Sequence, residues 1–226
     1  MTLKSERFEV YNTVFNFMIE HDIHSVPVKA VEIANLLSAE LIPLSTLAKR
    51  SGLPPEDIMS ILGSNDGVTC AYHSQDKVVY KIIYNDRQSM ERIRFTCLEE
   101  CSHILLGHTE DQRFNIFSQS YEEDIYLKYD ELARIAAGLF LCPPQLFFNY
   151  KSYLSTGALM EVCDISEACA KARKGALLRF ESEIKTHPLY STLPTIRCKK
   201  NPNIQMRHLK PVWGQDGSCG QFQIIP

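Results

Sequence analysis

Apolar residues recur at helical spacing over several parts of the chain. Residues 6 to 21 carry one broad apolar face, and residues 31 to 37 predict a second, short helix. Residues 41 to 44 predict a short strand that ends at a proline. A third helical pattern, for which Asn85 and Gln88 have capping-box spacing, runs to residue 106, where Gly107 stops it. The chain therefore begins with a mixture of helices and strand.

The pattern changes between residues 66 and 84. Residues 68 to 72 and 78 to 84 are rich in β-branched and aromatic side chains, and a polar turn separates them. This predicts a β-hairpin. Two more helices are expected at residues 129 to 140 and 166 to 185, the latter capped by Ser166, and a solvated loop holding Glu122, Glu123 and Asp124 precedes the first. The last forty residues carry five prolines and little periodicity, so an irregular tail is expected. Together these elements predict an α+β fold.

Residues 44 to 62 allow two interpretations. Their apolar rhythm fits a helix-turn-helix unit, but the exposed start of the would-be recognition helix reads Pro-Pro-Glu-Asp. Acidic side chains there would repel phosphate, which favours two short structural helices.

Composition and charge bound the function. A net charge of −3 argues against a broad nucleic-acid surface, although residues 185 to 215 hold basic side chains and no acidic ones. We expect a solvated tail, with weak docking to nucleic acid or an acidic partner as the alternative. No apolar run is long enough to span a bilayer, and the N-terminus lacks the apolar core of a signal peptide, so a cytoplasmic protein without a membrane role is expected. The eight cysteines form no C-x-x-C pair and are expected to be free thiols.

One helical face carries candidate chemistry. At about 100° per residue, Glu99 and His103 lie one turn apart on the side opposite Cys97 and Cys101, with Glu100 beside them. The cysteines are therefore expected in the core. Two ligands at i and i+4 converge on a metal, and the carboxylate after the first can act on metal-bound water. The alternative is a solvated polar face, which E-E-x-x-H forms in many amphipathic helices.

The surroundings of this segment resemble the ImmA/IrrE family of metallo-endopeptidases. The resemblance rests on a strand ending in Tyr-Asn-Asp at 84–86, Arg-x-Arg-Phe-Thr at 92–96, and Ile-Leu-Leu-Gly-His at 104–108. A further segment, 131–141, resembles the family's second helix, which carries a metal-binding glutamate. The resemblance covers about residues 25 to 150, and it implies a zincin-like core with a small β-sheet or hairpin packed on several helices and the motif on a central helix.

The resemblance implies a role for each matching residue. Glu99, His103 and Glu131 stand at the three metal-ligand positions, and Glu100 at that of the general base. The degenerate motif has glutamate where the family has its first histidine, and Ser102 where it has glycine. The resemblance implies Zn²⁺ as the cofactor. Two carboxylates beside one imidazole weaken selectivity for zinc, so Mn²⁺ or no metal are the alternatives. They also acidify bound water less, which leaves slow hydrolysis, or none, as an alternative to full activity.

Two functions follow as expectations. The first is a metal-dependent endopeptidase acting on a protein substrate such as a helix-turn-helix repressor of a mobile genetic element or stress regulon. The alternative is an inactive pseudopeptidase that binds or senses a regulatory protein. In either case residues 1–150 are expected to form the peptidase-like domain, and residues 151–226 a C-terminal helix with an irregular basic tail.

Overall fold

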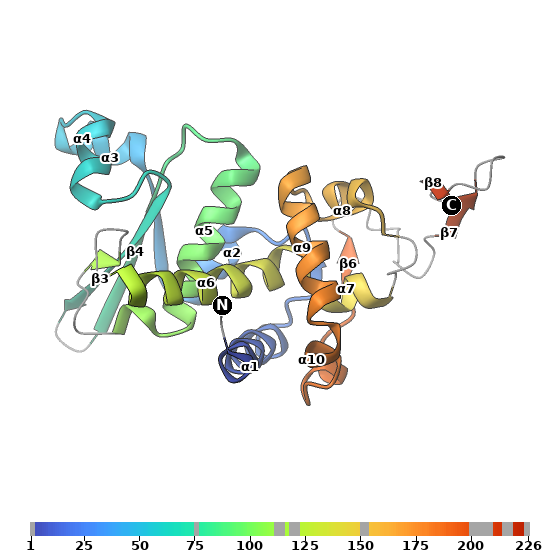
Figure 1. Ribbon diagram of the computed structural model, residues 1–226. Coiled ribbons are helices and arrows are strands. Elements are labelled where there is room, and N and C mark those ends of the chain that lie inside the picture. The colour runs from blue at the N-terminus through green and yellow to red at the C-terminus, as the bar shows by residue number, and fades with distance from the viewer. Residues whose placement is uncertain are drawn as a thin grey trace. The chain divides into compact units, whose positions relative to one another are not determined.

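The computed structural model describes residues 3–74, 77–110, 116–117, 123–149, 154–198, 210–213 and 219–223 (Figure 1). Within these residues the chain is mainly helical with three small sheets, which confirms the α+β expectation. The helices are α1 (Lys4–Glu20), α2 (Ala30–Leu36), α3 (Leu44–Ser51), α4 (Pro55–Leu62), α5 (Met90–Leu105), α6 (Glu123–Leu141), α7 (Pro144–Asn149), α8 (Thr156–Cys163), α9 (Glu167–Arg179) and α10 (Glu181–Lys185), with the 3-10 turns η1 (His108–Glu110) and η2 (Tyr190–Thr192). The strands are β1 (Ser25–Val26), β2 (Ala39–Pro43), β3 (Gly67–Ser74), β4 (Lys77–Tyr84), β5 (Ile116–Phe117), β6 (Arg197–Cys198), β7 (Lys210–Trp213) and β8 (Cys219–Gln223).

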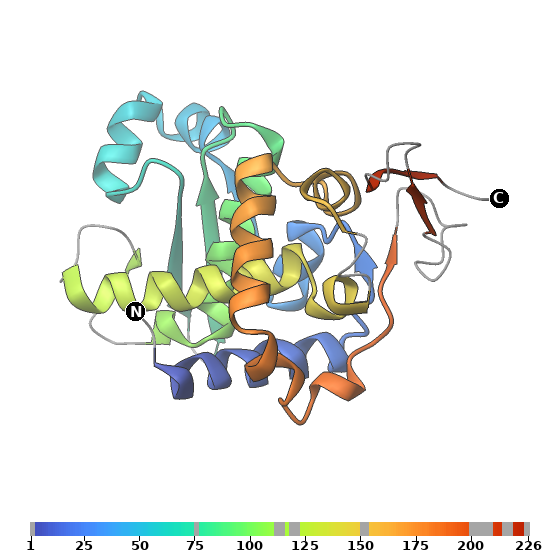
Figure 2. The ribbon, with the colours of Figure 1, turned by 45° about the vertical axis from the view of Figure 1, so that its right-hand side comes forward.

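The largest sheet has the strand order β2-β4-β3-β5. β3 and β4 form the predicted antiparallel hairpin, with Thr69 opposite Ile82, and β2 adds to it in parallel through β4. Apolar and polar residues alternate along the strands of the sheet, and four of the apolar side chains form a buried cluster: Ile42, Val68, Cys70 and Ile83. Leu47 and Leu62 pack against this cluster. α5 lies beside β3 and β4, so the sheet supports the helix that carries the motif (Figures 1 and 2).

The start of α5 corrects one prediction. The helix begins at Met90 with Ser89 as its N-cap, whose Oγ accepts a hydrogen bond from the Arg92 amide at 3.3 Å. The expected capping box at Asn85 does not form, because the Asn85 side chain holds the preceding loop instead. Its Nδ2 donates to the Asn65 carbonyl at 3.0 Å, and its Oδ1 accepts from the Arg87 amide at 3.1 Å. The predicted end is confirmed, since Gly107 adopts a left-handed φ of 73° just beyond the helix.

Other boundaries differ from the sequence pattern. α6 begins at Glu123, so Glu123 and Asp124 belong to a helix and not to the expected loop, whereas Glu122 lies outside the described residues. The helix predicted over 166 to 185 is divided at Phe180 into α9 and α10, although its cap at Ser166 is confirmed by a 3.3 Å bond from the Cys169 amide. The tail is less irregular than expected, because it contains β6 and the β7–β8 hairpin.

The chain divides into two compact units. One comprises Met1–Thr13 and Lys29–Ala137, and the other comprises Val14–Val28 and Gly138–Pro226. The first contains the four-stranded sheet and α5. In the second, β1 pairs in parallel with β6, and α8 packs on α9. The division into compact units leaves the expected domain boundary at residue 150 as a prediction.

No helix in the described part of the chain is both long enough and apolar enough to cross a membrane.

Candidate functional site

The polar residues of the degenerate motif are buried. Glu99 is 7%, Glu100 8% and His103 2% exposed, so the solvated-face alternative is wrong. The residues from Thr96 to Ile104 are buried on every side of α5, with the sheet against one part of its surface. Buried ionisable side chains need partners, because an unpaired polar group in an apolar interior costs roughly 1–3 kcal/mol or more.

Gly67 allows α5 to lie this close to the sheet. A Cβ at this first residue of β3 would stand 2.5 Å from the Thr96 Cγ2 and 3.4 Å from the Glu100 Cγ. Carbon atoms do not approach to 2.5 Å without displacement, so only glycine fits here. The close contact puts β3 within hydrogen-bonding reach of the motif.

Glu100, the expected general base, is bound to β3. The Thr69 Oγ lies 2.6 Å from its Oε2 and 3.3 Å from its main-chain carbonyl. Burial raises the pKa of Glu100 to about 8, and the hydrogen bond from Thr69 opposes this only in part. At neutral pH the side chain is therefore mainly a neutral acid. A general base needs a free carboxylate, which this environment disfavours.

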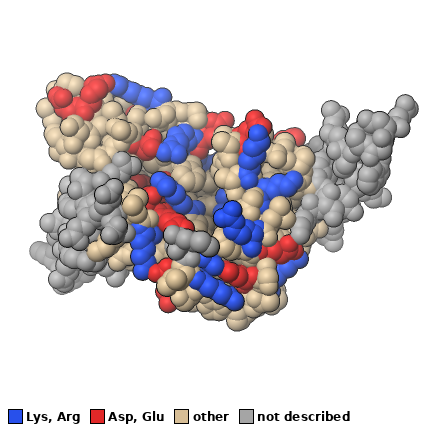
Figure 3. Space-filling model, viewed as in Figure 1, with Lys and Arg blue, Asp and Glu red and all other residues tan. Residues whose placement is uncertain are grey.

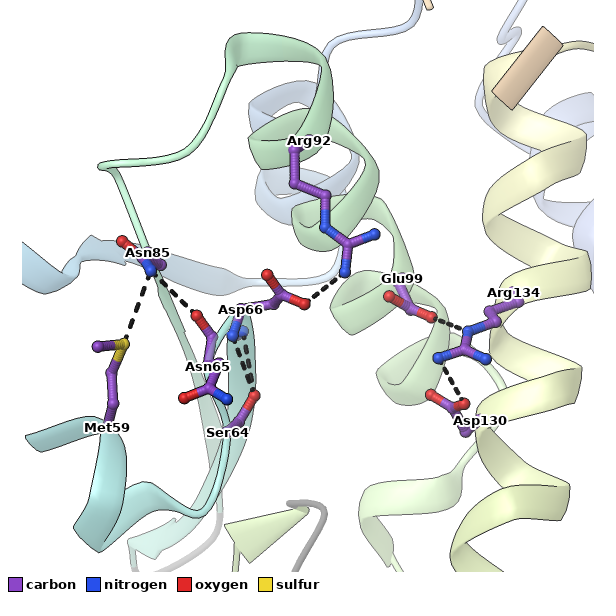
Figure 4. A network of polar contacts seen from close by, with 10 residues as sticks. Met59, Ser64, Asn65, Asp66, Asn85, Arg92, Glu99, Asp130 and Arg134 are labelled. Atoms are coloured by element: carbon purple, nitrogen blue, oxygen red, sulfur yellow. Dashed lines mark hydrogen bonds and ion pairs between the residues drawn. The ribbon is translucent and has the colours of Figure 1, made fainter. Parts of the chain in front are cut away.

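Glu99 is held by a residue of α6. Arg134 donates from Nε to the Glu99 Oε1 at 2.9 Å, and its Nη2 lies 2.9 Å from the Asp130 Oδ2 one turn earlier (Figure 4). The two carboxylates are 10% and 8% exposed, whereas the arginine side chain is 57% exposed. Burial and the nearby Asp130 raise the pKa of Glu99 to about 7, while Arg134 opposes the shift. One guanidinium thus bridges two buried acids from two helices.

His103 contacts the histidine that follows α5. Its Nδ1 lies 3.0 Å from the Nδ1 of His108, so one ring donates and the other accepts. The His108 ring stacks on Tyr129 of α6, with centroids 4.3 Å apart and planes 12° from parallel. Burial lowers the pKa of His103 well below its usual value and that of His108 to about 4. Both rings are neutral at physiological pH, and both side chains are buried.

Glu131, the expected third ligand, follows Asp130 on α6, and its role as a ligand stays a prediction. Successive helical residues point about 100° apart, and it is Asp130 that shares Arg134 with Glu99. Across the described ranges, no three histidine, cysteine or acidic side chains converge so that they could hold a metal ion, and the trio of Glu99, His103 and Glu131 falls within those ranges.

The residues present therefore do not fit the zinc site that the family resemblance implies. A dication bound through Glu99 would stand next to the positive guanidinium of Arg134, which already takes that carboxylate's Oε1. Like charges at such a distance repel strongly in a buried environment. The carboxylates of Glu99 and Asp130 are thus arranged around the guanidinium of Arg134.

The Tyr-Asn-Asp segment at the end of β4 has structural partners. The Asp86 carboxylate accepts hydrogen bonds from the Ser45 amide at 3.0 Å and from its hydroxyl at 2.5 Å, close to the start of α3. Arg92 of α5 forms an ion pair with Asp66 in the loop before β3 (Figure 4). These contacts tie α3, the hairpin and α5 together around the motif.

Helix geometry placed the motif's cysteines correctly. Cys97 and Cys101 are 2% and 0% exposed, and burial raises the pKa of both thiols, that of Cys97 to about 12. Both thiols are therefore protonated at neutral pH, and neither is a nucleophile there. Seven cysteines within the described residues are free thiols, as expected; Cys219 lies in β8.

The sequence pattern does not reveal the partners that Glu99 and Glu100 use. The i,i+4 spacing of Asp130 and Arg134 is a visible signal for an ion pair, but nothing in it indicates that the pair faces Glu99. Thr69 lies 31 residues from Glu100, and no local pattern links them.

The surface gives a mixed charge pattern. On the face drawn in Figure 3, basic and acidic side chains of the described residues alternate. Of the basic tail, Lys199, Lys200 and Arg207 lie outside the described residues. The weak nucleic-acid contact considered for the tail stays a prediction.

A comparison with known protein families finds no match to this sequence, and a comparison with curated proteins finds no significant similarity.

Proposed function

We propose that this chain is a cytoplasmic pseudopeptidase with a zincin-like core of the ImmA/IrrE type, which acts by binding a regulatory protein. The observation that carries the proposal is the position of Arg134 between Glu99 and Asp130. A guanidinium that bridges two buried acids supplies the positive charge that a metal ion would bring. It cannot acidify a water molecule or polarise a peptide carbonyl as a metal does.

The states of the neighbouring side chains support the same proposal. Hydrolysis by this family's chemistry needs an ionised general base, and burial keeps Glu100 mainly protonated near neutral pH. His103 is engaged with His108, and no group of three histidine, cysteine or acidic side chains among the described residues could hold a metal ion. The polar cluster then stabilises the arrangement of α5 and α6, and the surface built on these helices is left to bind a partner.

The partner class follows from the family resemblance alone. A helix-turn-helix repressor of a mobile genetic element or stress regulon is the substrate class of the family, and a pseudopeptidase would retain affinity for such a protein without cleaving it. When such a repressor is mixed with the purified protein, the proposal predicts a complex that runs as one species in size-exclusion chromatography and an intact repressor after prolonged incubation.

The metal-dependent endopeptidase remains the second candidate, and one observation favours it: Glu100 and His103 are both retained and buried within one turn of α5. It requires Arg134 to leave Glu99 and a metal, expected to be Zn²⁺ or Mn²⁺, to take its place with His103 and Glu131. Repressor cleavage by the wild-type protein that is lost in Glu100→Gln would establish it and refute the pseudopeptidase.

A restoration experiment tests the loss of the metal site. Combining Glu99→His with Arg134→Leu supplies an imidazole at the first position and frees Asp130 to serve as an acidic ligand. The double variant should bind about one Zn²⁺ per chain, whereas Glu99→His alone should bind little because Arg134 stays. A folded double variant that takes up no zinc would remove the support for a core of metallopeptidase type.

A further inference from the structure

A polar pocket separate from the Glu99–Arg134–Asp130 bridge lies within the unit that contains the sheet. Its volume is about 290 Å³, and it is lined by α1, by α6 and by the turn after α5. Lys128 on α6 binds Glu6 on α1 at 2.5 Å, so the two helices are joined at the pocket (Figure 2 shows α1 beside α6). The volume lies near the lower end of the range of small-molecule sites, roughly 300–1,000 Å³.

The charges around the pocket sum to −1. Glu6, Glu9 and Lys128 are the charged lining residues. Lys128 is held by Glu6, and this contact lowers the pKa of Glu6 and raises that of Lys128. The exposed Glu9 raises the Lys128 pKa through its field, but no contact to the Glu9 carboxylate is found in the described part of the chain. A cationic ligand is therefore favoured over an anionic one.

The remaining walls are apolar or aromatic. Val10 and Leu132 are 2% and 8% exposed, and the Tyr129 ring stands against His108. His108 is 5% exposed, and its ring lies nearly parallel to that of Tyr129. A flat ring or short alkyl chain can lie on these walls while its charged end stays near Glu9, and an aromatic face also attracts cations.

We propose that this pocket binds a small amphipathic organic cation, with an ammonium or guanidinium head at Glu9 and an apolar body against Val10, Tyr129 and Leu132. The site goes beyond the proposed function, because it uses neither Glu99 nor Glu100. It is linked to the motif through His108, which lines the pocket and lies 3.0 Å from His103. A bound cation is thus connected to α5 through the contact between His108 and His103.

Three probes of equal size and different charge test the proposal: 2-phenylethylammonium, 2-phenylethanol and phenylacetate. Calorimetric titration of the full-length protein at low salt should show saturable binding of the cation, weaker binding of the alcohol and none of the anion. Glu9→Gln should lower the affinity for the cation by about threefold to tenfold, as expected for one partly exposed charge pair. The same substitution should leave the affinity for 2-phenylethanol unchanged, since the apolar walls are intact.

Two further variants complete the test. Glu20→Gln, which removes an exposed glutamate of the same helix outside the pocket, should leave the affinity for the cation unchanged. Thr13→Phe, which places a ring in the pocket lining, should abolish binding of both cation and alcohol while the protein remains folded by circular dichroism. Absence of saturable cation binding to the wild type, or equal binding to Glu9→Gln, would overturn the proposal. Because the probes do not involve metal or repressor, their failure leaves the proposed function standing.

Discussion

The Nε of Arg134 lies 2.9 Å from the Oε1 of Glu99, which joins α6 to the buried motif of α5. Glu99 stands at the position of the first metal ligand in the family that the sequence resembles. The same guanidinium reaches Asp130, so a single exposed arginine forms ion pairs with two buried acids. This shared cation accounts for how Glu99 and Asp130 can both be buried.

Arg134→Met should therefore destabilise the protein. Glu99 and Asp130 would lose their shared cation while remaining buried, at a cost of about 1–3 kcal/mol in the free energy of unfolding at pH 7. The cost stays below that of a fully buried pair because Arg134 is 57% exposed and because Glu99 can take up a proton. Urea unfolding measures the change.

Lys171→Met is the matched control. It removes an i,i+4 pair with Glu167 in which both side chains are more than 60% exposed, and its effect should stay below about 0.5 kcal/mol. Equal effects of the two substitutions would mean that the bridge to Glu99 is no stronger than a surface pair.

Stability should fall as pH rises from 6.5 to 8. Glu99 and Glu100 have folded pKa values of about 7 and about 8, above the unfolded value of 4.5, so the folded state keeps protons that the unfolded state has released. Their contribution is lost as pH rises through the folded values. His103 and His108 act oppositely, because their lowered pKa values make stability rise with pH up to about 6.5. Above that pH, the raised pKa values of Glu99 and Glu100 make stability fall.

The loss over this window should be on the order of 1–2 kcal/mol. Unfolding curves at half-unit pH steps measure it. In Glu99→Gln/Glu100→Gln the two titrating groups are gone, and the curve between pH 6.5 and 8 should flatten. An unchanged slope in the double variant would show that other groups cause the dependence.

Gly67→Ala should cost about 1–3 kcal/mol, because its Cβ would overlap the Thr96 Cγ2 at 2.5 Å. Thr96→Ser removes that methyl group and should recover part of the loss in the double variant. Gly175→Ala is the control: it lies inside α9 with nothing within 4 Å of the new Cβ and should stabilise by about 0.5–1 kcal/mol. Thermal unfolding of the four proteins decides whether the close approach of β3 and α5 is real.

The local pattern predicted the elements that build the site, and the reasons are physical. The hairpin of β3 and β4 follows from alternating β-branched residues, and the end of α5 from the left-handed glycine at 107. Helix geometry also separated Cys97 and Cys101 from His103, because side-chain direction within one helix depends only on spacing.

The partners across elements could not be predicted in this way. Glu131 and Asp130 are adjacent on α6, and a rotation of about 100° decides which of them faces Glu99. That rotation is set by how α6 packs, which involves residues far apart in sequence. The burial of Glu99 and Glu100 was missed for the same reason, since an isolated amphipathic helix would expose them.

The metal content of the purified wild-type protein tests the central claim most directly. Protein prepared without chelator or affinity metal, dialysed into metal-free buffer and analysed by elemental mass spectrometry should carry far less than one zinc or manganese ion per chain, and Arg134→Met should not lower that value. About one equivalent of metal in the wild type, lost in both Glu99→Gln and His103→Gln, would contradict the account and establish a metal site where the arginine bridge is drawn.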